Sequence, residues 1–190
     1  MDIKLHILHD DRQPQKLPLL LNELSSQGIT NYEIVPAIIE GNKTVVESIN
    51  AGHKSIVRRA KEQGLPCVAI AEDDISFTAP DAWQYFLNQM PKEFDVYLAC
   101  SYIRNLVPNT GDIENLICGF HLYILNSSYY DAFLSVPDKE HIDVAVGDLK
   151  GNFVFCKPFP CLQRAGFSAN NPGEPVNYNG ILKSEDIYIG

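Results

Sequence analysis

Three consecutive carboxylates, Glu72, Asp73 and Asp74, directly follow an apolar run at residues 65–71. Carboxylates this close repel one another, and each favours its protonated form unless a cation compensates its charge. No lysine or arginine occurs among the next dozen residues. Ligands of open α/β sheets bind just beyond the carboxyl ends of the strands. The pattern therefore favours one of two interpretations: a Mn²⁺ or Mg²⁺ ion that bridges these carboxylates to a diphosphate, or a solvated acidic turn.

His53 and Asp143 are the other candidates for chemistry. His53 falls on the apolar stripe of an expected helix, where it either faces a ligand or is a core histidine bonded to a backbone carbonyl. Asn50, on the same helix, is expected near the same cleft. Asp143 is turned about 100° from the apolar face of a later helix, the rotation per helical residue. That position suits a general base beside a cleft, or an ordinary acidic residue in the first turn of a helix.

Strand and helix signals alternate along the chain. Thr44 and Glu47 form a capping-box pattern, and Gly28 and Gly64 are suited to end helices. Short apolar runs indicate strands, and apolar residues that recur every three to four positions indicate helices. The expected strands cover residues 3–8, 32–39, 65–71, 94–100, 116–125 and 152–156. The expected helices cover residues 14–27, 44–63, 80–90, 127–134 and 142–149, with a polar loop at 104–115.

This alternation predicts an α/β fold with a mostly parallel central sheet, a mixed edge and helices on both faces. Val68 to Ala71 is expected to be a central strand because it is apolar at every position. Residues 1–157 are expected to form one domain. From Pro158 on the chain is rich in proline, glycine and asparagine, so residues 158–190 are expected to form an extended, partly mobile tail on the surface.

The composition narrows the function classes. The chain of 190 residues has 15 Lys and Arg against 24 Asp and Glu, a formal net charge of −9. A chain this acidic is not expected to bind nucleic acid, and an anionic substrate would need a metal ion or a local basic patch. The sequence has neither an apolar window long enough to cross a membrane nor a signal-peptide pattern at its start. Its five cysteines, with no C-x-x-C pair, are expected to be reduced thiols in a cytoplasmic protein.

Several segments in a fixed order carry a family resemblance. They are a helical segment with a histidine (residues 48–60), the Glu-Asp-Asp strand end (68–75), a Gly-x-x-x-Tyr segment (119–126), a His-Ile-Asp element (141–143) and a late Phe-Ser pair (167–168). Over roughly residues 3–170 this order resembles glycosyltransferase family 25 and its bacterial lipopolysaccharide-biosynthesis relatives. The serine that usually precedes the histidine in that family is Gly52 in this chain.

The resemblance implies a GT-A fold that takes a nucleotide-sugar donor and transfers its sugar to a glycan or lipopolysaccharide-type acceptor. It implies Glu72 and Asp74 as ligands of Mn²⁺ or Mg²⁺, which would neutralise charge on the departing diphosphate, and Asp143 as the general base. It also implies a cytoplasmic protein, at most peripheral to the inner membrane. The implied donor-binding residues are Leu8, His9, Asp10, Arg12, Asn50, His53, Lys54 and Asp73.

Two other functions stay open on the sequence. A catalytically inactive relative would bind the nucleotide sugar without transferring it. A receiver-like signalling domain would use acidic residues after its first strand, and Asp10 and Asp11 occupy that position. A receiver would also need a strand-end aspartate with a lysine nearby. The three alternatives therefore differ in the fold and in the pocket that they require.

Overall fold

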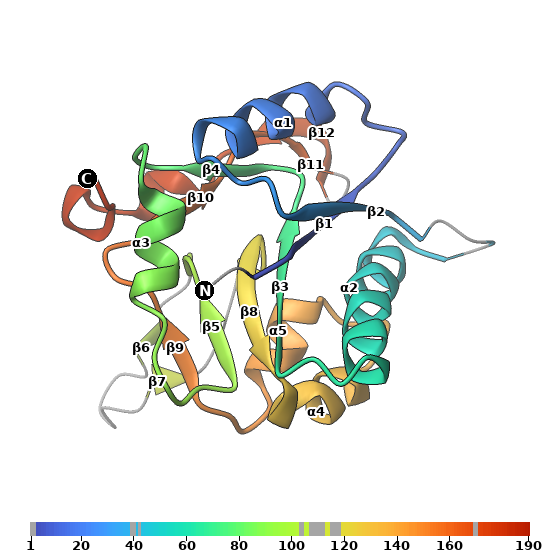
Figure 1. The fold of residues 1–190 in the computed structure, drawn as a ribbon. Helices are drawn as coiled ribbons and strands as arrows, with labels where there is room; N and C mark the ends of the chain where they lie inside the picture. The colour runs from blue at the N-terminus through green and yellow to red at the C-terminus, as the bar shows by residue number, and fades with distance from the viewer. Residues whose placement is uncertain are drawn as a thin grey trace.

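The computed structural model describes residues 3–38, 41, 43–102, 105–106, 113–114, 119–168 and 171–190. Its centre is a six-stranded sheet in the order β2-β1-β3-β8-β5-β9 (Figure 1). The strands are β1 (Leu5–His9), β2 (Tyr32–Pro36), β3 (Cys67–Glu72), β5 (Val96–Leu98), β8 (Leu122–Asn126) and β9 (Phe153–Phe155). Each of the six overlaps a strand expected from the sequence, although residues 116–118 of the expected fifth strand lie outside the described residues.

β3 lies inside the sheet, as its apolar sequence predicts. It pairs in parallel with β1 and antiparallel with β8. Val68 and Ile70 pack into one core cluster, Ala69 and Ala71 pack into the other, and all four side chains are buried. A strand covered on both faces has room for polar side chains only where it ends. The acidic triplet therefore begins at Glu72, the last residue of β3.

β8 is the antiparallel strand of this sheet. It runs antiparallel to β3 and β5, whereas β1 pairs in parallel with β2 and β5 pairs in parallel with β9. The sequence predicted that the antiparallel pairing would lie at an edge of the sheet. The antiparallel pairs lie inside the sheet instead, because β8 lies between β3 and β5. The order also differs from the parallel 2-1-3-4-5 order of flavodoxin-like receiver folds. The fold therefore does not support the receiver hypothesis.

Helices cover both faces of the sheet, which gives three layers (Figure 1). α1 (Lys16–Ser26) and α3 (Ala82–Asn88) pack against one face. α2 (Val45–Glu62), α4 (Tyr130–Ser135) and α5 (Ile142–Gly147) pack against the other. This arrangement confirms the fold class predicted from the alternation of strands and helices.

Local signals set the ends of α1 and α2. The Thr44 hydroxyl accepts a hydrogen bond from the backbone N–H of Glu47, and the Glu47 carboxylate accepts one from the N–H of Thr44, so the predicted capping box is present. Gly28 and Gly64 follow the two helices, each with a φ of 64°. Glycine adopts this left-handed conformation without steric strain, which is why it commonly ends helices.

The apolar stripe of α1 is narrower than the helical spacing of Leu17, Leu20, Leu21 and Leu24 predicts. Leu20 and Leu24 are buried, Leu17 is half-buried, and Leu21 is 41% exposed. Leu20 and Leu24 lie four residues apart, so they stack on one line of the helix surface. That line faces the sheet, and Leu21, one position further round, points away from it.

Residues 158–190 pack against the domain over part of their length. β10 (Cys161–Gln163) pairs antiparallel with β4 (Ile75–Phe77), the short strand just after the acidic triplet. Phe159 and Cys161 are buried, and Figure 1 shows β10, β11 and β12 beside α1. This segment thus reaches the acidic strand end. Its other elements are β11 (Gly166–Ser168), β12 (Asn171–Val176), η2 (Asn179–Ile181) and η3 (Ser184–Asp186).

The remaining elements lie away from the strand end. β6 (Asn105–Leu106) pairs with β7 (Ile113–Glu114) inside the loop expected at 104–115, most of which lies outside the described residues. η1 (Ser127–Tyr129) precedes α4. No disulfide joins the described cysteines, and Cys118 lies outside the described residues. Among the helices that the structure describes, none has the length and apolar character to cross a membrane.

Candidate functional site

Two parallel strand ends meet at the acidic triplet. In the register of β1 and β3, Leu8 lies opposite Glu72, so the following residues, His9 and Asp73, are also neighbours. A cavity of about 730 Å³, including space open to solvent, lies at this edge of the sheet. β1 and its following loop, one face of α2, Lys16 and the triplet line it. The carboxyl edge of parallel strands is where open α/β sheets bind their ligands.

Asp73 is buried, and both of its carboxylate oxygens have partners. His9 Nδ1 lies 2.8 Å from Oδ2, and the backbone N–H of Asp10 donates to the same oxygen at 3.4 Å. The Lys16 ammonium donates to Oδ1 at 3.1 Å. Asp73 therefore joins the end of β3 to the loop after β1 and to the start of α1.

Asp74 shares the Lys16 ammonium with Asp73. Lys16 Nζ lies 3.4 Å from Asp74 Oδ2, and the side-chain amide of Gln163 donates to the same oxygen at 3.1 Å. Asp74 Oδ1 is buried and has no hydrogen-bond partner among the described residues. Burial lowers the pKa of Lys16, but the carboxylates of Asp74 and Asp73 outweigh it and raise that pKa above its ordinary value. The triplet thus has a basic neighbour, which comes from a part of the chain far away in sequence.

α1 is held in place over the strand end by two of its side chains. The Glu23 carboxylate accepts from the backbone N–H of Phe77 at 2.7 Å and from the Arg164 guanidinium at 2.9 Å. The amide of Gln27 donates to the carbonyl of Ala79 at 2.8 Å. These bonds fix α1 to β4 and to the segment after β10. They therefore hold Lys16, the first residue of α1, beside the two aspartates.

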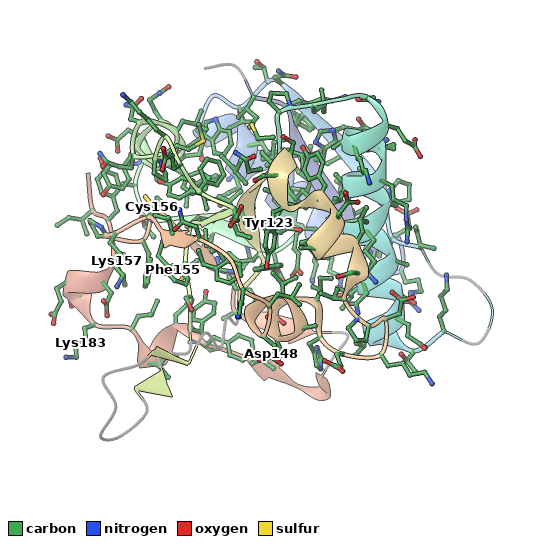
Figure 2. All side chains as sticks on the ribbon, turned by 90° about the horizontal axis from the view of Figure 1, so that it is seen from below. Tyr123, Asp148, Phe155, Cys156, Lys157 and Lys183 are labelled. Carbon is green, nitrogen blue, oxygen red and sulfur yellow. The ribbon has the colours of Figure 1, made fainter. Side chains whose placement is uncertain are left out.

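Glu72 belongs to a separate cluster with His53 and Tyr123. His53 Nε2 lies 3.2 Å from Glu72 Oε1, and His53 Nδ1 lies 2.8 Å from the Tyr123 hydroxyl. His53 and Tyr123 are fully buried, whereas 29% of the Glu72 side chain is exposed. Figure 2 shows Tyr123 among the interior side chains, while Lys183 lies at the margin of the molecule. His53 is thus a buried histidine that also lines the pocket, and its partners are side chains instead of a backbone carbonyl.

Burial determines the ionisation of this cluster. It lowers the pKa of His53 to about 4, so the imidazole is neutral near pH 7. Burial, helped by the charges of Asp74, Asp143 and Asp73, raises the pKa of Glu72 well above 4.5. Burial also raises the pKa of Tyr123, so its hydroxyl keeps a proton to donate to His53 Nδ1. When Tyr123 donates to Nδ1, the single N–H of the neutral imidazole is on Nε2, which donates to Glu72.

Asp10 and Arg12 form an ion pair at the rim of the pocket. Arg12 Nη2 lies 2.8 Å from Asp10 Oδ2, and Arg12 Nε donates to Asp10 Oδ1 at 2.9 Å. Hydrogen bonds from Arg12 lower the pKa of Asp10 to about 2. The Arg12 side chain is 56% exposed. A negatively charged ligand in the pocket can therefore reach this guanidinium.

Gly52 allows α2 to approach β1 closely. A Cβ atom at this position would lie 2.8 Å from Leu8 Cδ2. A serine here, as in the family that the sequence resembles, would require the Leu8 side chain to move. Both residues line the pocket, so the glycine and the leucine together shape its wall.

Asn50 and Lys54 do not line the pocket. The Asn50 amide donates to the carbonyls of Asp138 and Glu140 at 2.9 and 2.6 Å. Lys54 donates to the carbonyl of Val136 at 2.6 Å and contacts the Asp138 carboxylate. The structure places these two predicted donor-binding residues against residues 136–140, because successive helix positions are rotated by about 100° and both point away from the pocket face.

Asp143 lies near the pocket without lining it. Its Oδ2 accepts from the backbone N–H of Gly119 at 3.1 Å, and its Oδ1 accepts from the N–H of Val144 at 2.9 Å. Its negative charge contributes to the raised pKa of Glu72. Both carboxylate oxygens therefore already have backbone partners, and the role of Asp143 as a base stays a prediction.

The described residues do not form the metal site expected at Glu72 and Asp74. Among them, no group of three or more His, Cys, Asp or Glu side chains is arranged to hold an ion. One or two carboxylates plus substrate phosphates can also hold Mg²⁺, and Asp74 Oδ1 is a free acceptor for such a contact. The Lys16 ammonium, however, lies 3.4 Å from the other oxygen of that carboxylate, and Glu72 is bonded to His53. The observed arrangement therefore does not fit a divalent ion.

Three side chains that bond to the acidic triplet or to His53 were not predicted from the sequence: Lys16, Gln163 and Tyr123. Lys16 could have been found, because it begins the helix just after the loop expected at the pocket. Tyr123 is the tyrosine of the Gly-x-x-x-Tyr segment, so the resemblance contained a signal for it. Gln163 carries no such signal, since it lies in a region with the composition of a surface tail.

No known protein family and no curated protein matches the sequence. Solved structures do match. A glycosyltransferase involved in glycosylation of the major capsid of PBCV-1 shares 10% identity over 83% of each chain, with a TM-score of 0.50. A Drosophila beta-1,4-galactosyltransferase 7 mutant in complex with manganese, UDP-Gal and xylobiose shares 14% identity over 80% of this chain and 64% of its own, with a TM-score of 0.46. A nucleoside-diphosphate-sugar pyrophosphorylase from Vibrio cholerae shares 11% identity over 84% and 75%, with a TM-score of 0.41.

The first of these matches bears on the fold. At 10% identity and a TM-score of 0.50 it shows a common architecture and not a common activity. The chain has the GT-A-like α/β fold of glycosyltransferases. The resemblance to family 25 in particular is not shown by these structures.

Proposed function

We propose that the chain is a glycosyltransferase that binds a nucleotide-sugar donor in the pocket between β1, β3 and α2. One observation carries the proposal: the residues after β1 and the acidic end of β3 meet His53 in a single cavity at the carboxyl edge of the sheet. A GT-A-type donor site built from these residues requires them to share one cavity. The GT-A-like fold supports it, because that edge is where such sheets bind nucleotides.

The pocket lining combines the apolar and cationic side chains that a nucleoside diphosphate needs. Leu8, Ala37, Val45 and Ile49 give one part of the lining an apolar surface, which suits the flat face of a nucleobase. Arg12 and Lys16 line the same pocket, and cationic side chains bind phosphates through charge-assisted hydrogen bonds. We place the diphosphate near these two residues and the sugar near the strand end.

In the proposed reaction, the bond between the anomeric carbon and the diphosphate oxygen breaks. The hydroxyl oxygen of a glycan or lipopolysaccharide-type acceptor bonds to that carbon, and the hydroxyl proton passes to a base. Asp143 is the base that we propose, since its carboxylate lies near enough to Glu72 to affect the pKa of that residue. No step is assigned to Mn²⁺ or Mg²⁺, because of the two carboxylates expected to hold the ion, Asp74 is paired with Lys16 and Glu72 is bonded to His53.

Thermal unfolding with a panel of nucleotide sugars tests the donor. A donor at about 100 times its Kd should add roughly 2.7 kcal/mol of stability, with UDP-, GDP- and CDP-sugars measured in parallel. Free monosaccharides serve as the control, because they lack the diphosphate and base that the pocket is proposed to hold. If none of the panel shifts the melting temperature, the proposal is contradicted.

Turnover separates an enzyme from an inactive binding module. Hydrolysis of a bound donor by water can be followed without knowledge of the acceptor. Release of nucleoside diphosphate and free sugar by the wild-type protein would support a transferase. Tight binding with no release, in the presence of glycan acceptors as well as in water, would instead identify a nucleotide-sugar-binding module.

A further inference from the structure

The ammonium of Lys16 lies between the two aspartates of the strand end. It is 3.1 Å from Asp73 Oδ1 and 3.4 Å from Asp74 Oδ2. Its side chain is 19% exposed, and the bonds of Glu23 and Gln27 hold its helix in place. Asp74 is one of the two carboxylates expected to hold a divalent ion, so the ammonium already pairs with an expected metal ligand.

An ammonium and a divalent cation cannot share this position. Both are positive, so an ion bound to Asp74 would be repelled by an ammonium in contact with the same carboxylate. Asp73 adds a second constraint, because His9 and the N–H of Asp10 occupy its other oxygen. A metal could therefore bind both aspartates only after Lys16 had left them.

We propose that Lys16 is the built-in cation of this pocket, and that it contacts the donor's diphosphate in place of a divalent metal ion. The inference rests on the proposed donor pocket. An ammonium has three N–H donors, and the two aspartates account for two of them. The third is available for a phosphate oxygen on the pocket side, where the exposed Arg12 guanidinium supplies further donors.

The proposal also resolves a conflict in the charge of the chain. A protein with a net charge of −9 needs a local cation to hold an anionic donor. Lys16 provides one on a rigid helix, so its side chain loses little additional freedom when a ligand binds.

The wild-type protein gives the first test. Binding of UDP, GDP and CDP is measured by isothermal titration calorimetry, once in excess EDTA and once with Mn²⁺. We expect one nucleoside diphosphate to bind in EDTA with the same Kd as in Mn²⁺. Binding that appears only with Mn²⁺ would overturn the inference while leaving the proposed function intact. Binding of none of them under either condition would contradict the proposed function itself.

Lys16→Gln gives the second test. The amide keeps hydrogen-bond donors for the aspartates and removes the positive charge. Loss of one charge-assisted contact should weaken nucleotide binding about 10- to 100-fold in EDTA. Lys16→Arg keeps the charge and should retain most of the affinity. Lys4→Gln is the matched control, because Lys4 pairs with Glu33 at the far end of β1 and β2 and should leave affinity unchanged. Unchanged affinity in Lys16→Gln would overturn the inference.

Metal binding to the protein alone gives a readout that does not depend on any nucleotide. Mn²⁺ electron paramagnetic resonance should detect weak or no binding to the wild type. Lys16→Gln should bind Mn²⁺ more tightly, because Asp73 Oδ1 and Asp74 Oδ2 lose their cation. Equal Mn²⁺ affinity in the two proteins would contradict the claim that Lys16 and a metal exclude each other. If Lys16→Gln does not fold, the wild-type comparison of EDTA with Mn²⁺ decides the question.

Discussion

Two regions of this molecule contain similar networks of buried polar side chains but have different surroundings. The strand-end cluster consists of Glu72, Asp73 and Asp74 with their partners His9, Lys16 and His53. The loop clamp consists of Asn50 and Lys54 bonded to residues 136–140. Both regions contain buried polar side chains that bond to distant parts of the chain, and both use residues of α2.

Each region leaves one buried oxygen without a hydrogen-bond partner among the described residues, Asn50 Oδ1 and Asp74 Oδ1, and the difference lies in which of them belongs to a residue that lines the cavity. Asn50 and Lys54 donate chiefly to backbone carbonyls, and neither lines the pocket. In the strand-end cluster, Asp74 Oδ1 lacks a partner among the described residues, Glu72 is partly exposed, and the whole group faces a cavity. Burial and polarity therefore do not by themselves mark a ligand site. Unused hydrogen-bonding capacity beside a cavity is the better sign.

His53→Ala should have the largest effect on folding, because His53 lies where α2 meets the strand-end cluster. The change leaves a cavity and removes the partner of the buried Tyr123 hydroxyl. We expect the free energy of unfolding to fall by about 2–4 kcal/mol, together with weaker donor binding. Denaturant unfolding and calorimetric titration measure the two effects.

Tyr123→Phe distinguishes the loss of the hydrogen bond from the loss of side-chain packing in His53→Ala. It removes the same bond and keeps the ring, so it should cost only about 1 kcal/mol. A loss in His53→Ala no larger than that in Tyr123→Phe would mean that His53 contributes little packing. Intact donor affinity in His53→Ala would assign the residue to the core alone.

Asn50→Ala should affect stability without affecting the pocket. The change removes the donor for the carbonyls of Asp138 and Glu140, in hydrogen bonds that are partly buried, at a cost of about 1–3 kcal/mol. Nucleotide affinity should match the wild type. Asn88→Ala, at an exposed asparagine of α3 bonded to Gln84, is the control and should cost little. A large loss of affinity in Asn50→Ala would remove the distinction between the two regions.

The sequence predicts the framework of this site better than its contacts. Strand-like and helix-like spacings of apolar residues alternate along the chain, and this alternation predicts the α/β layers. The continuous apolar run at 65–71 predicts that β3 lies inside the sheet. Parallel strands bring their carboxyl ends together, so the meeting of the loop after β1 with Glu72 follows from topology. The orientation of α2 does not follow from topology, since rotating the helix by one residue would exchange Asn50 with a residue that lines the pocket.

Lys16 shows why the charge balance of the site could not be predicted. In the sequence it is more than fifty residues from Asp73, and its approach depends on how α1 packs over β4 through Glu23 and Gln27. An absence of basic residues along the chain says nothing about which helix covers a strand end. The metal prediction relied in part on that absence, and the packing of α1 supplies the basic neighbour that the triplet lacks along the chain.

Glu72→Gln should raise stability at neutral pH. Because burial and nearby carboxylates raise the pKa of Glu72 in the folded state, the folded protein holds this proton more tightly than the unfolded chain does. Ionisation therefore favours unfolding as pH rises above about 4.5. The variant should melt higher than the wild type at pH 7–8, and the difference should shrink as pH falls toward 4.5. Melting curves across this range check the sign, and a variant less stable than the wild type at pH 8 would contradict it.

Asp143→Asn should have the smallest effect on stability and decides between two roles. Asp143 lies in the first turn of α5 and accepts from the N–H groups of Gly119 and Val144. An asparagine oxygen can still accept one of these bonds, so the lost helix-dipole interaction should cost only ~0.3–1 kcal/mol. If Asp143 is the base, donor binding should stay normal while sugar transfer falls on the order of 10²–10⁴-fold. Asp148→Asn, at an exposed carboxylate just after the same helix, is the control. Equal rates and pH profiles of donor hydrolysis in the two variants would leave Asp143 with a structural role, holding Gly119 to the start of α5.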